Sequence, residues 1–525
     1  MVLLTLWLVA WIGLSWAAIQ DDALIHLRYA DNFYQTRHIS YDSVHPDYGA
    51  SSLAYVVLLS ALRAFTSSVD LPRSVSSAAH LILFAGLAWL VMVRLPKGAV
   101  ISRLLGVALL LILVSPSSVR WLDDGMETGV GLCIVTLLCC LTFRQSRHSS
   151  LTSSRYAGLA LAGLVAVLLR TELVLLCGIS FAILSLQYLK QNRKTVAESS
   201  VLRYWAALLG AASPILLGGV LALAIIVWRM HVLLPDTAVA KSHGLVAWKG
   251  VVTSTPTILA GAMSFGVGLL LLWCLSLVLV IRSGRGALSI VCANSVFPVT
   301  LLLALLRGQE IQGARYLAWT FFFSIVWNLL TLAFPPLLTT HPSPSHAVTS
   351  IQTHKDPTGT VLIYALISLF FLAQPIEVTL MYRVLTRRAG TLSQFKQQHL
   401  ETLAGKLGTA FDVGYIGYFS QARICDLAGL VNGREAAHGT NDARAAACAA
   451  RRPDFLFVNR PQIGLMQEHM SLEGWQICGR YNFINLKTPD THYLLLPHLT
   501  AASLCHAISG NAPEPLSRIL AAPAL

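Results

Sequence analysis

Charged residues are scarce in this chain. Asp, Glu, Lys and Arg make up 12% of its 525 residues, whereas about a quarter is ordinary for a soluble domain. The hydrophobic share is 55%, and the mean hydropathy is +0.64. Apolar stretches of about 18 residues or more recur along the chain, and roughly 20 residues cross the hydrocarbon core of a bilayer. The composition therefore excludes an ordinary soluble protein and predicts an α-helical polytopic membrane protein.

Acidic residues are fewer than basic ones, at 25 against 38, which gives a net charge of +13. A positive balance of this size is compatible with nucleic-acid binding. However, the Lys and Arg residues lie in short loops between apolar stretches, as membrane topology requires. The expected partner is therefore the lipid bilayer, and no nucleic acid is expected.

The sequence contains no Cys-x-x-Cys pattern, so a structural zinc site is not expected. Six of the ten cysteines lie in apolar stretches and are interpreted as small buried hydrophobic residues. The other four are in the C-terminal tail, namely Cys425, Cys448, Cys478 and Cys505. These four can form disulfides if the tail faces an oxidising compartment, but the sequence does not fix their pairing.

The apolar pattern predicts eleven membrane spans. The first, Val2 to Ile19, is expected to stay uncleaved, because no Lys or Arg precedes it and it is longer than a signal-peptide core. A shorter apolar stretch, Ser51 to Phe65, is expected to lie at the membrane surface rather than to span it. The other ten predicted spans are 73–95, 98–116, 127–143, 156–170, 171–189, 204–228, 256–281, 286–306, 316–337 and 359–382.

Basic residues gather in four of the loops, and the positive-inside rule places these loops in the cytoplasm. This orientation puts Asp21, Asp22 and the tail on the extracytoplasmic side. The four clusters are Arg94/Lys97/Arg103, Arg144/Arg147/Arg155, Lys190/Arg193/Lys194/Arg203 and Arg282/Arg285.

The tail changes character after about residue 383. Short β-type runs such as Phe411–Phe419 and Pro453–Val458 alternate with helical patterns, which predicts a small α/β domain. Its roughly 140 residues suffice for an independent core. We therefore expect a transmembrane module over 1–383 and a soluble domain over 384–525.

Asp21 and Asp22 follow directly on the first apolar run. Charges cost several kcal/mol at mid-bilayer, so an acidic pair at a helix exit is either a solvated cap or a working site. The segment that follows is rich in Asp, His, Arg and Tyr. A helix that begins near Asp21 would place Asp22, His26 and Tyr29 on one face.

Other loops on the same side also carry polar residues. The loop after Arg120 contains Asp124 and Glu127, which add to a metal or sugar site or form an ordinary loop and helix cap. Arg170-Thr171-Glu172 interrupts an apolar stretch and predicts a turn that lines a cavity. Arginine suits phosphate because its planar fork donates paired hydrogen bonds. The candidates for binding a lipid phosphate are Arg28, Arg170, Lys241, Arg307 and Arg315. The alternative for each is that the side chain extends to the lipid headgroups without binding a substrate.

These loops, in this order, resemble those of the integral-membrane glycosyltransferases of the C type (GT-C), in particular the bacterial relatives of mycobacterial cell-wall arabinofuranosyltransferases. The resemblance covers nearly the whole chain. It rests on Asp21–Asn32, Ile39–Asp42, Tyr48–Leu53, Asp124–Thr128, Arg170–Glu172, Leu234–Thr237 with Ala240-Lys241, and Asp412–Phe419 with Asp426–Leu430.

The resemblance implies a polyprenyl-phosphate sugar donor, an active site on the extracytoplasmic side of the bacterial inner membrane, and inversion at the anomeric carbon. The acceptor would be a cell-envelope glycan or a lipid-linked molecule. Asp21 or Asp22 would be the general base, with a preference for Asp21 because it opens the family's loop. Arg28 or Arg315 would hold the phosphate or position the base. Some GT-C enzymes use a divalent cation, so a cation is possible and no metal ligand is assigned.

The loops together supply the candidate substrate-binding residues. They are His26, Arg28, Tyr29, Tyr41, Tyr48, Asp124, Glu127, Arg170, Glu172, Lys241, Glu310 and Arg315.

Two other classes compete with the transferase. A transporter or flippase of lipid-linked sugars would have polar residues deep within several spans and often repeated halves, whereas these spans are nearly free of charge and no internal repeat is evident. A non-catalytic envelope scaffold, with a tail that binds glycan, would not need the acidic pair at the helix exit.

Overall fold

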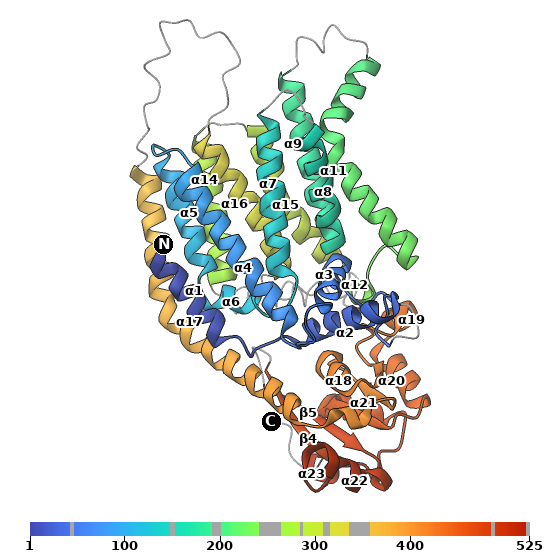
Figure 1. Cartoon of the computed structure of the whole chain (residues 1–525). Helices are drawn as coiled ribbons and strands as arrows, with labels where there is room; N and C mark the ends of the chain where they lie inside the picture. Colours follow the sequence, from blue (N-terminus) through green and yellow to red (C-terminus); the bar gives the residue numbers. More distant parts are fainter. Residues whose placement is uncertain are drawn as a thin grey trace, which may run out of the picture.

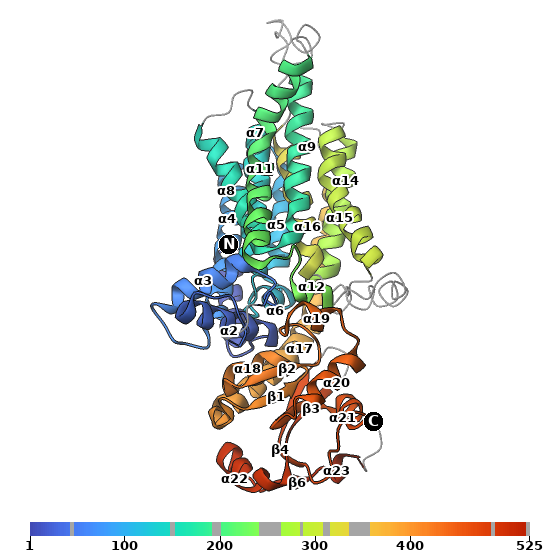
Figure 2. The ribbon, with the colours of Figure 1, turned by 90° about the vertical axis from the view of Figure 1, so that its right-hand side faces the viewer.

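The computed structural model of the chain describes residues 1–42, 47–147, 153–191, 201–240, 264–283, 287–307, 315–334, 357–484 and 489–520. The described part is mostly helical, with one small domain that contains a β-sheet. Figure 1 shows long helices side by side, with the sheet domain at one end of them. Figure 2, after a quarter turn, shows the same two parts stacked. The predicted combination of a helical module and a small C-terminal sheet domain is confirmed.

The helices before the sheet domain begin and end at ordinary sequence signals. For example, α6 begins with Pro116 after Ser115, whose hydroxyl accepts a hydrogen bond from the backbone of Ser118. The helices are α1 (Val2–Leu14), α2 (Asp21–Thr36), α3 (Leu53–Arg63), α4 (Leu71–Trp89), α5 (Val100–Leu113), α6 (Pro116–Leu122), α7 (Thr128–Ser146), α8 (Ser153–Leu169), α9 (Val174–Gln191), α11 (Val201–Met230), α12 (Asp236–Ala240), α14 (Leu269–Arg282), α15 (Ala287–Arg307), α16 (Arg315–Ala333) and α17 (Pro357–Gln397), with short turns η1 (Leu90–Arg94), η2 (Thr171–Leu173) and η4 (Ser264–Gly268).

Within the described residues, six helices are long and apolar enough to cross a membrane. They are Leu71–Arg94, Thr128–Ser146, Thr171–Leu189, Ser213–Met230, Phe265–Arg282 and Pro357–Gln397. The pair α5 and α6 passes the same test together but is bent by 69°. The other predicted spans coincide with shorter apolar helices, Val2–Leu14, Ser153–Leu169, Leu288–Leu303 and Leu317–Ala333. Several long apolar helices therefore support a membrane protein, and the number of eleven spans stays a prediction.

The helices that surround the predicted site gather at one end of the helical part. Figures 1 and 2 show α2, α3, α6 and α12 where this part meets the sheet domain. The helix α3 has 11 residues and packs against α2. The segment that contains α2 and the segment that contains α12 are far apart in sequence, and both lie beside the sheet domain.

The helix α17 joins the two parts without a break. It spans 41 residues, and Figure 1 shows it running along the helical part and into the sheet domain. Near its end, Phe395 is fully buried against Tyr415 and Tyr481 of the tail. The predicted boundary between residues 383 and 384 lies inside this helix. The sequence did not show where the sheet domain begins, because a continuous helix leaves no local signal for a boundary.

The sheet has six strands in the order β2-β1-β3-β5-β4-β6. The strand β1 is parallel to β2 and β3, and the remaining pairs are antiparallel. Helices connect the parallel strands, as a crossover between parallel strands requires. The strands are β1 (Leu407–Ala410), β2 (Arg423–Asp426), β3 (Phe455–Asn459), β4 (Gln476–Ile484), β5 (Pro489–Leu496) and β6 (Glu514–Pro515), and the helices are α18 (Val413–Ser420), α19 (Gly433–His438), α20 (Asn441–Ala450), α21 (Arg460–Gln467), α22 (His498–Ser509) and α23 (Ser517–Leu520).

All four tail cysteines are paired in disulfides. Cys425 of β2 is bonded to Cys448 of α20, and Cys478 of β4 is bonded to Cys505 of α22. The six cysteines of the helical part are free. Disulfides persist in oxidising compartments, so this division agrees with a tail on the extracytoplasmic side.

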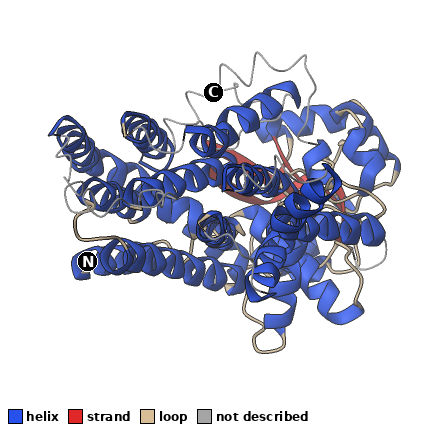
Figure 3. Ribbon diagram, turned by 90° about the horizontal axis from the view of Figure 1, so that it is seen from above, coloured by secondary structure: helices blue, strands red, loops and turns tan. Residues whose placement is uncertain are grey.

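The sheet domain and the N-terminal segment share one hydrophobic core. Tyr29 and Tyr41 are buried in the same cluster as Phe395, Tyr415 and Ile416. The long helices pack in a separate core around buried aromatic residues of α16. In the view from above, in Figure 3, the strands lie toward one side of the helical part. The tail is therefore packed on the segment that follows α1.

Candidate functional site

The acidic pair stands at the first turn of α2, where the helix begins at Asp21. Carboxylates are favourable there, because the helix dipole is positive at its N-terminus. The backbone N–H of Gln20 donates to the carbonyl of Asp124 at 2.9 Å. This bond fixes the turn between α1 and α2 against the loop that contains Asp124 and Glu127.

The carboxylate of Asp21 binds the N-terminus of α18. Its two oxygens accept hydrogen bonds from the backbone N–H of Gly414 at 2.9 Å and of Tyr415 at 2.7 Å. Helix N-termini carry unsatisfied N–H groups, which an anionic side chain satisfies well. Burial raises the pKa of Asp21 to about 7, against the lowering effect of the bond from Tyr415, and the charge of Asp22 adds to the rise. Asp21 is therefore a docking residue for the tail.

Arg28 binds the other end of α18. Its side chain donates to the carbonyl oxygens of Tyr41 at 2.8 Å, of Ala422 at 2.7 Å and of Gly417. The guanidinium also lies over the ring of Tyr41, at 4.3 Å from its centroid. Each of the three guanidinium nitrogens of Arg28 is engaged with backbone, which argues against the expected phosphate contact. Its position is that of a residue that holds α18 on α2.

Two glycines allow this close contact. A side-chain carbon at Gly414 would collide with the backbone of Asp21, and one at Gly417 would collide with the hydroxyl of Tyr41. That hydroxyl donates to the carbonyl of Val413 at 2.6 Å. The Asp412–Phe419 motif is thus explained by docking, since only glycine leaves room for the two helices to meet.

The predicted residues Tyr29 and Tyr41 lie in the same junction. The hydroxyl of Tyr29 accepts a bond from the N–H of Gly49 at 3.0 Å. Asp47 accepts bonds from the N–H of Tyr41 at 3.0 Å and of Gly49 at 3.2 Å. Burial raises the pKa of Asp47 to about 7. Both tyrosines are buried, so they shape the loop after α2 rather than present a surface to a substrate.

A second group of predicted residues forms a chain of polar contacts beside α2. The Nδ1 atom of His26 lies 2.9 Å from the carbonyl of Asp22. A carbonyl only accepts, so Nδ1 carries the proton. The Nε2 atom lies 3.3 Å from the hydroxyl of Ser51 and 3.9 Å from a carboxylate oxygen of Glu127. The face of α2 that carries His26 therefore lies beside the loop that contains Glu127.

Arg170 links that loop to the next one. Its Nε lies 2.7 Å from Glu127, and its Nη1 lies 3.3 Å from Glu172. The guanidinium faces the ring of Trp319 in α16 at 5.6 Å. Glu127 is fully buried, whereas 38% of the Glu172 side chain is exposed. The turn Arg170–Glu172 thus contacts the loop of Glu127. Arg170 links the buried carboxylate of Glu127 to the partly exposed carboxylate of Glu172.

The loop from Asp123 to Glu127 is held rigidly. Asp124 is buried, and one of its carboxylate oxygens accepts a bond from the N–H of Met126 at 3.0 Å. Gly125 has a positive φ of 90° and packs against Ala23 of α2. The hydroxyl of Tyr55 lies 2.8 Å from the carbonyl of Gly125. The loop therefore positions Glu127 by backbone contacts on both sides.

Tyr48 and Asp236 connect the site to the start of α12. The N–H of Asp236 donates to Tyr48 at 2.8 Å, and the N–H of Tyr48 lies 3.3 Å from the Asp236 carboxylate. Arg434 of α19 lies 3.6 Å from the same carboxylate. Burial raises the pKa of Tyr48, and the charges of Glu172 and Asp236 add to this rise. Tyr48 therefore lies between the Arg170–Glu172 turn and the tail.

Three predicted residues are not placed. Lys241 and Glu310 lie outside the residues that the structure describes, and Arg315 is described only as the first residue of α16.

Two buried residues near the site were missed by the sequence analysis. His80 of α4 lies 2.8 Å from Asp123 through Nδ1 and 3.0 Å from the carbonyl of Leu113 through Nε2. Glu377 of α17 accepts a bond from the N–H of Ser117 at 2.8 Å and caps α6. An acid and a histidine inside apolar runs were the available signals, since such groups are rare in membrane helices unless they have partners.

A metal site does not form among the predicted acidic residues that the structure describes. The described part has one group with suitable spacing, Asp442, Glu468 and His469, on the tail. Both acids of that group are exposed, and such groups are common without a metal.

Comparison with known proteins identifies only the tail. Residues 381–496 match a family described as a domain of unknown function (DUF8728). The match begins inside α17 and ends with the last residue of β5, so it covers most of the sheet domain and does not reach the helical part. No curated protein and no solved structure matches the chain.

Proposed function

We propose that the chain is a GT-C type glycosyltransferase of the bacterial inner membrane. It would move a sugar from a polyprenyl-phosphate donor to a cell-envelope glycan or a lipid-linked acceptor on the extracytoplasmic side. The observation that carries the proposal is the meeting of two acidic segments at one end of the helical part. His26, one turn after Asp22, lies 3.9 Å from Glu127, which is in turn bound by Arg170.

Several further features support an active site on the extracytoplasmic side. The two tail disulfides agree with an oxidising compartment. The helices α2, α6 and α12 and the sheet domain lie at the same end of the long helices (Figure 1). With eleven spans, the four basic loops would lie at the cytoplasmic end. A donor whose isoprenoid chain lies in the bilayer would then present its phosphate and sugar at the level of α2.

We propose Asp22, which is half-buried in the first turn of α2, as the base, because Asp21 holds the tail domain. Both oxygens of Asp21 are engaged by the N-terminus of α18, and a base must be able to approach the acceptor hydroxyl. In the proposed reaction, Asp22 takes the proton of that hydroxyl, whose oxygen then attacks the anomeric carbon. The bond between this carbon and the phosphate oxygen breaks, and the lipid phosphate leaves on the opposite face. Attack from the face opposite the leaving phosphate inverts the configuration at the anomeric carbon.

Arg170 would stabilise the leaving phosphate. Its guanidinium is fixed by Glu127, Glu172 and the ring of Trp319. The side chain would therefore need little reorganisation when negative charge develops on the leaving phosphate. Arg315 is the second candidate for this role. Arg28 and Asp21, which hold the tail domain, would act as positioning residues for the first turn of α2.

The transporter alternative finds little support in the described helices. One polar cluster between the described helices consists of Asn294, Asn328 and Ser276, with Trp273 beside them. These side chains bind one another across α14, α15 and α16, as residues that lock helices together do. They line up as an interhelical contact rather than as a path for a sugar.

A reconstituted system separates the two functions. The full-length protein would be placed in vesicles with a panel of radiolabelled polyprenyl-phosphate sugars and a crude envelope-glycan acceptor. A transferase converts the label into a glycan that no longer partitions with lipid. A flippase moves the label across the bilayer without making a new glycosidic bond, and a scaffold does neither, so either of these results would overturn the proposal.

A further inference from the structure

The helix α4 carries a fully buried histidine within an apolar sequence. The side chains of His80 and of its partner Asp123 are both 0% exposed. His80 lies nine residues after Leu71, the first residue of α4, which is about 14 Å along a helix. No ionisable side chain follows it before Arg94. Ionisable groups at such positions are rare and costly, so the pair calls for a specific role.

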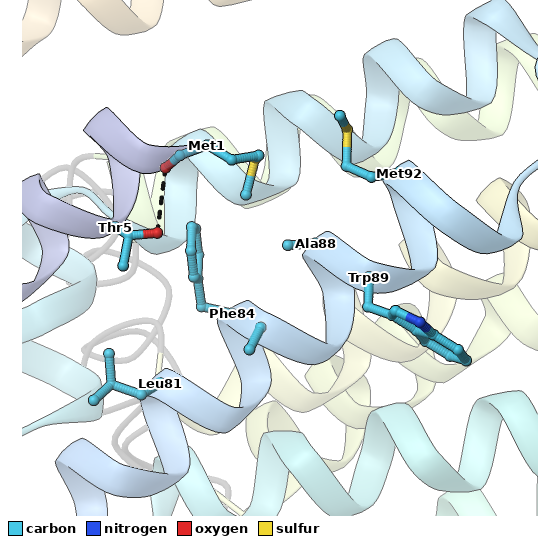
Figure 4. Close-up of a pocket in the computed structure, with 8 residues that line it drawn as sticks. Met1, Thr5, Leu81, Phe84, Ala88, Trp89 and Met92 are labelled. Carbon is cyan, nitrogen blue, oxygen red and sulfur yellow. Dashed lines mark hydrogen bonds between the residues drawn. The ribbon is translucent and has the colours of Figure 1, made fainter.

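The turns that follow His80 are apolar on the side that faces α1. They line a groove of about 470 Å³, across which Figure 4 shows Phe84 and Ala88 facing Met1 and Thr5. None of the eight residues that line this groove has an ionisable side chain. The role of His80 therefore lies on the other side of α4, where its partner is.

The two contacts of the His80 ring define where its protons are. Nε2 lies 3.0 Å from the carbonyl oxygen of Leu113, and a carbonyl only accepts, so Nε2 carries a proton. Nδ1 lies 2.8 Å from Oδ2 of Asp123, so a second proton lies between these two atoms. Whether that proton is on the ring or on the carboxyl group, the pair has no net charge. Without His80, the carboxylate of Asp123 would be a buried unpaired charge.

The residue Asp123 begins the loop Asp123–Glu127. In the described part of the chain, Oδ1 of Asp123 has no hydrogen-bond partner, so His80 makes the one hydrogen bond of this carboxyl group there. One turn before His80 on α4, the hydroxyl of Ser76 accepts a bond from the backbone N–H of Gly125 at 3.2 Å. The helix α4 therefore holds the loop at two points.

This loop contacts both parts of the proposed transfer site. The carbonyl of Asp124 accepts a bond at 2.9 Å from the N–H of Gln20, which directly precedes the acidic pair. At the other end of the loop, Glu127 lies 2.7 Å from Nε of Arg170. The loop therefore sets the spacing between the first turn of α2 and Arg170, and His80 fixes the start of the loop.

We propose that His80 is a positioning residue, which acts through Asp123 on the loop and keeps Asp22 and Arg170 in their relative places. A misplacement of about 1 Å in an active site can lower a rate by about 100-fold. The contact of His80 with Leu113 only anchors the ring between helices, so it should contribute to stability alone. The effect on the rate rests on the function proposed above, whereas the effect on the loop does not.

Two variants separate the two contacts of the ring. Asn carries its amide nitrogen at the position of Nδ1, and Gln carries it at the position of Nε2. His80→Asn therefore keeps the contact with Asp123 and loses the one with Leu113, and His80→Gln does the reverse. Leu329→Ala is the control for lost stability, because Leu329 is a buried residue of α16 beside Gly106, about 10 Å along α5 from Leu113.

The position of the loop is measured by amide hydrogen exchange. Full-length protein in detergent would be followed at the N–H groups of Gln20 and Gly125, which exchange when the loop opens locally. We expect exchange at least about tenfold faster in His80→Gln and wild-type exchange in His80→Asn and Leu329→Ala. Unchanged exchange in His80→Gln, or equally fast exchange in both His80 variants, would overturn the inference.

The rate of transfer gives a separate result. His80→Gln should lower kcat at least about tenfold at an unchanged KM for the donor, and His80→Asn should keep most of the wild-type kcat. Losses that follow the Tm in all three variants would show a merely structural role and would also overturn the inference. If the wild type transfers nothing with any donor, the proposed function fails, and the exchange data still decide the role of His80.

A second pair of variants serves if His80→Gln does not fold. Asp123→Asn can donate its amide N–H to Nδ1 of His80, so its exchange at Gln20 should match the wild type. Asp123→Leu has a similar size but no donor, so its exchange should be faster. Equal exchange in these two variants would contradict the positioning role.

Discussion

The carboxylate of Asp21 accepts a hydrogen bond from the backbone N–H of Tyr415 at 2.7 Å, across 394 positions of the chain. The hydroxyl of Tyr415 in turn donates to the carbonyl of Ile19 at 2.7 Å. The first turn after α1 and the first turn of α18 are therefore built against each other. Movement of the tail domain would break both contacts, so the tail and the first turn of α2 form one structural unit.

Docking of α18 on α2 depends on the two glycines of the tail motif. Gly414→Ala should lower stability by about 1–3 kcal/mol, because the added carbon meets the backbone of Asp21 and overpacked contacts cost roughly this much. The measurement is the Tm in detergent together with the rate at which a protease releases the tail. Gly464→Ala is the control: Gly464 is in α21 with no atom within 4 Å of the added carbon, so this variant should be unchanged or slightly more stable. Equal losses in both variants would show that docking is not the cause.

Stability should rise as the pH falls toward 5. Burial raises the pKa of Asp21 and Asp47 to about 7 and that of Asp426 to about 6, whereas each is near 3.8 when unfolded. The folded state therefore binds more protons between pH 4 and 7, and the contribution present below pH 4 is lost as the pH rises through 7.

Asp47→Asn isolates one of these carboxylates. The Tm of the wild type should increase between pH 8 and pH 5, and the increase should be smaller in the variant, because one titrating group is gone. Two parallel curves would mean that Asp47 does not titrate in this range.

Thiol counting tests the disulfides and the compartment together. The chain has ten cysteines, of which the structure leaves six free. Protein from cell membranes, denatured without a reductant, should react with six equivalents of a thiol reagent. Removing the Cys425–Cys448 bond, which closes a loop of 23 residues, should cost about 3 kcal/mol of stability. Ten reactive thiols would contradict an oxidising location for the tail.

The planar guanidinium of Arg170, which contacts two carboxylates at once, should matter more for the rate of sugar transfer than its charge alone. Arg170→Lys keeps the charge but cannot contact Glu127 and Glu172 together, so transfer should fall at least tenfold. Arg282→Lys is the control, since Arg282 is an exposed residue at the far end of α14. A Tm measured beside the rate separates lost positioning from lost folding. Equal rates for Arg170→Lys and the wild type would remove Arg170 from the proposed site.

The sequence predicted the main parts of the fold because they follow from local patterns. Apolar runs marked the helices, and the alternation of short β-type runs with helical ones marked the α/β tail. The prediction of a β-type run at Phe411–Phe419 was wrong, because Val413–Ser420 forms the helix α18. The start of α2 at Asp21 and the turn at Arg170 were also visible, since charges within apolar sequence need a reason. That the loop with Asp124 and Glu127 lies near α2 was one of two alternatives that the sequence left open, and the structure has His26 3.9 Å from Glu127.

The roles of individual residues required the structure. Nothing near Arg28 in the sequence shows that its donors go to Gly417 and Ala422, almost 400 residues away. The same distance hides the contacts of Asp21, which moved the preferred base to Asp22. His80 and Glu377 were overlooked because each stands alone in an apolar context, and their partners come from other segments of the chain.

The rate of sugar transfer by Asp22→Asn tests the central claim most directly. Full-length protein would be assayed with a radiolabelled polyprenyl-phosphate sugar, beside Asp442→Asn as a surface control. Loss of a general base typically costs 10²–10⁴-fold. We predict transfer by the wild type and by Asp442→Asn, and a decrease of at least about 100-fold in Asp22→Asn at an unchanged Tm. Full transfer by Asp22→Asn, or no transfer by the wild type with any donor, would contradict the account.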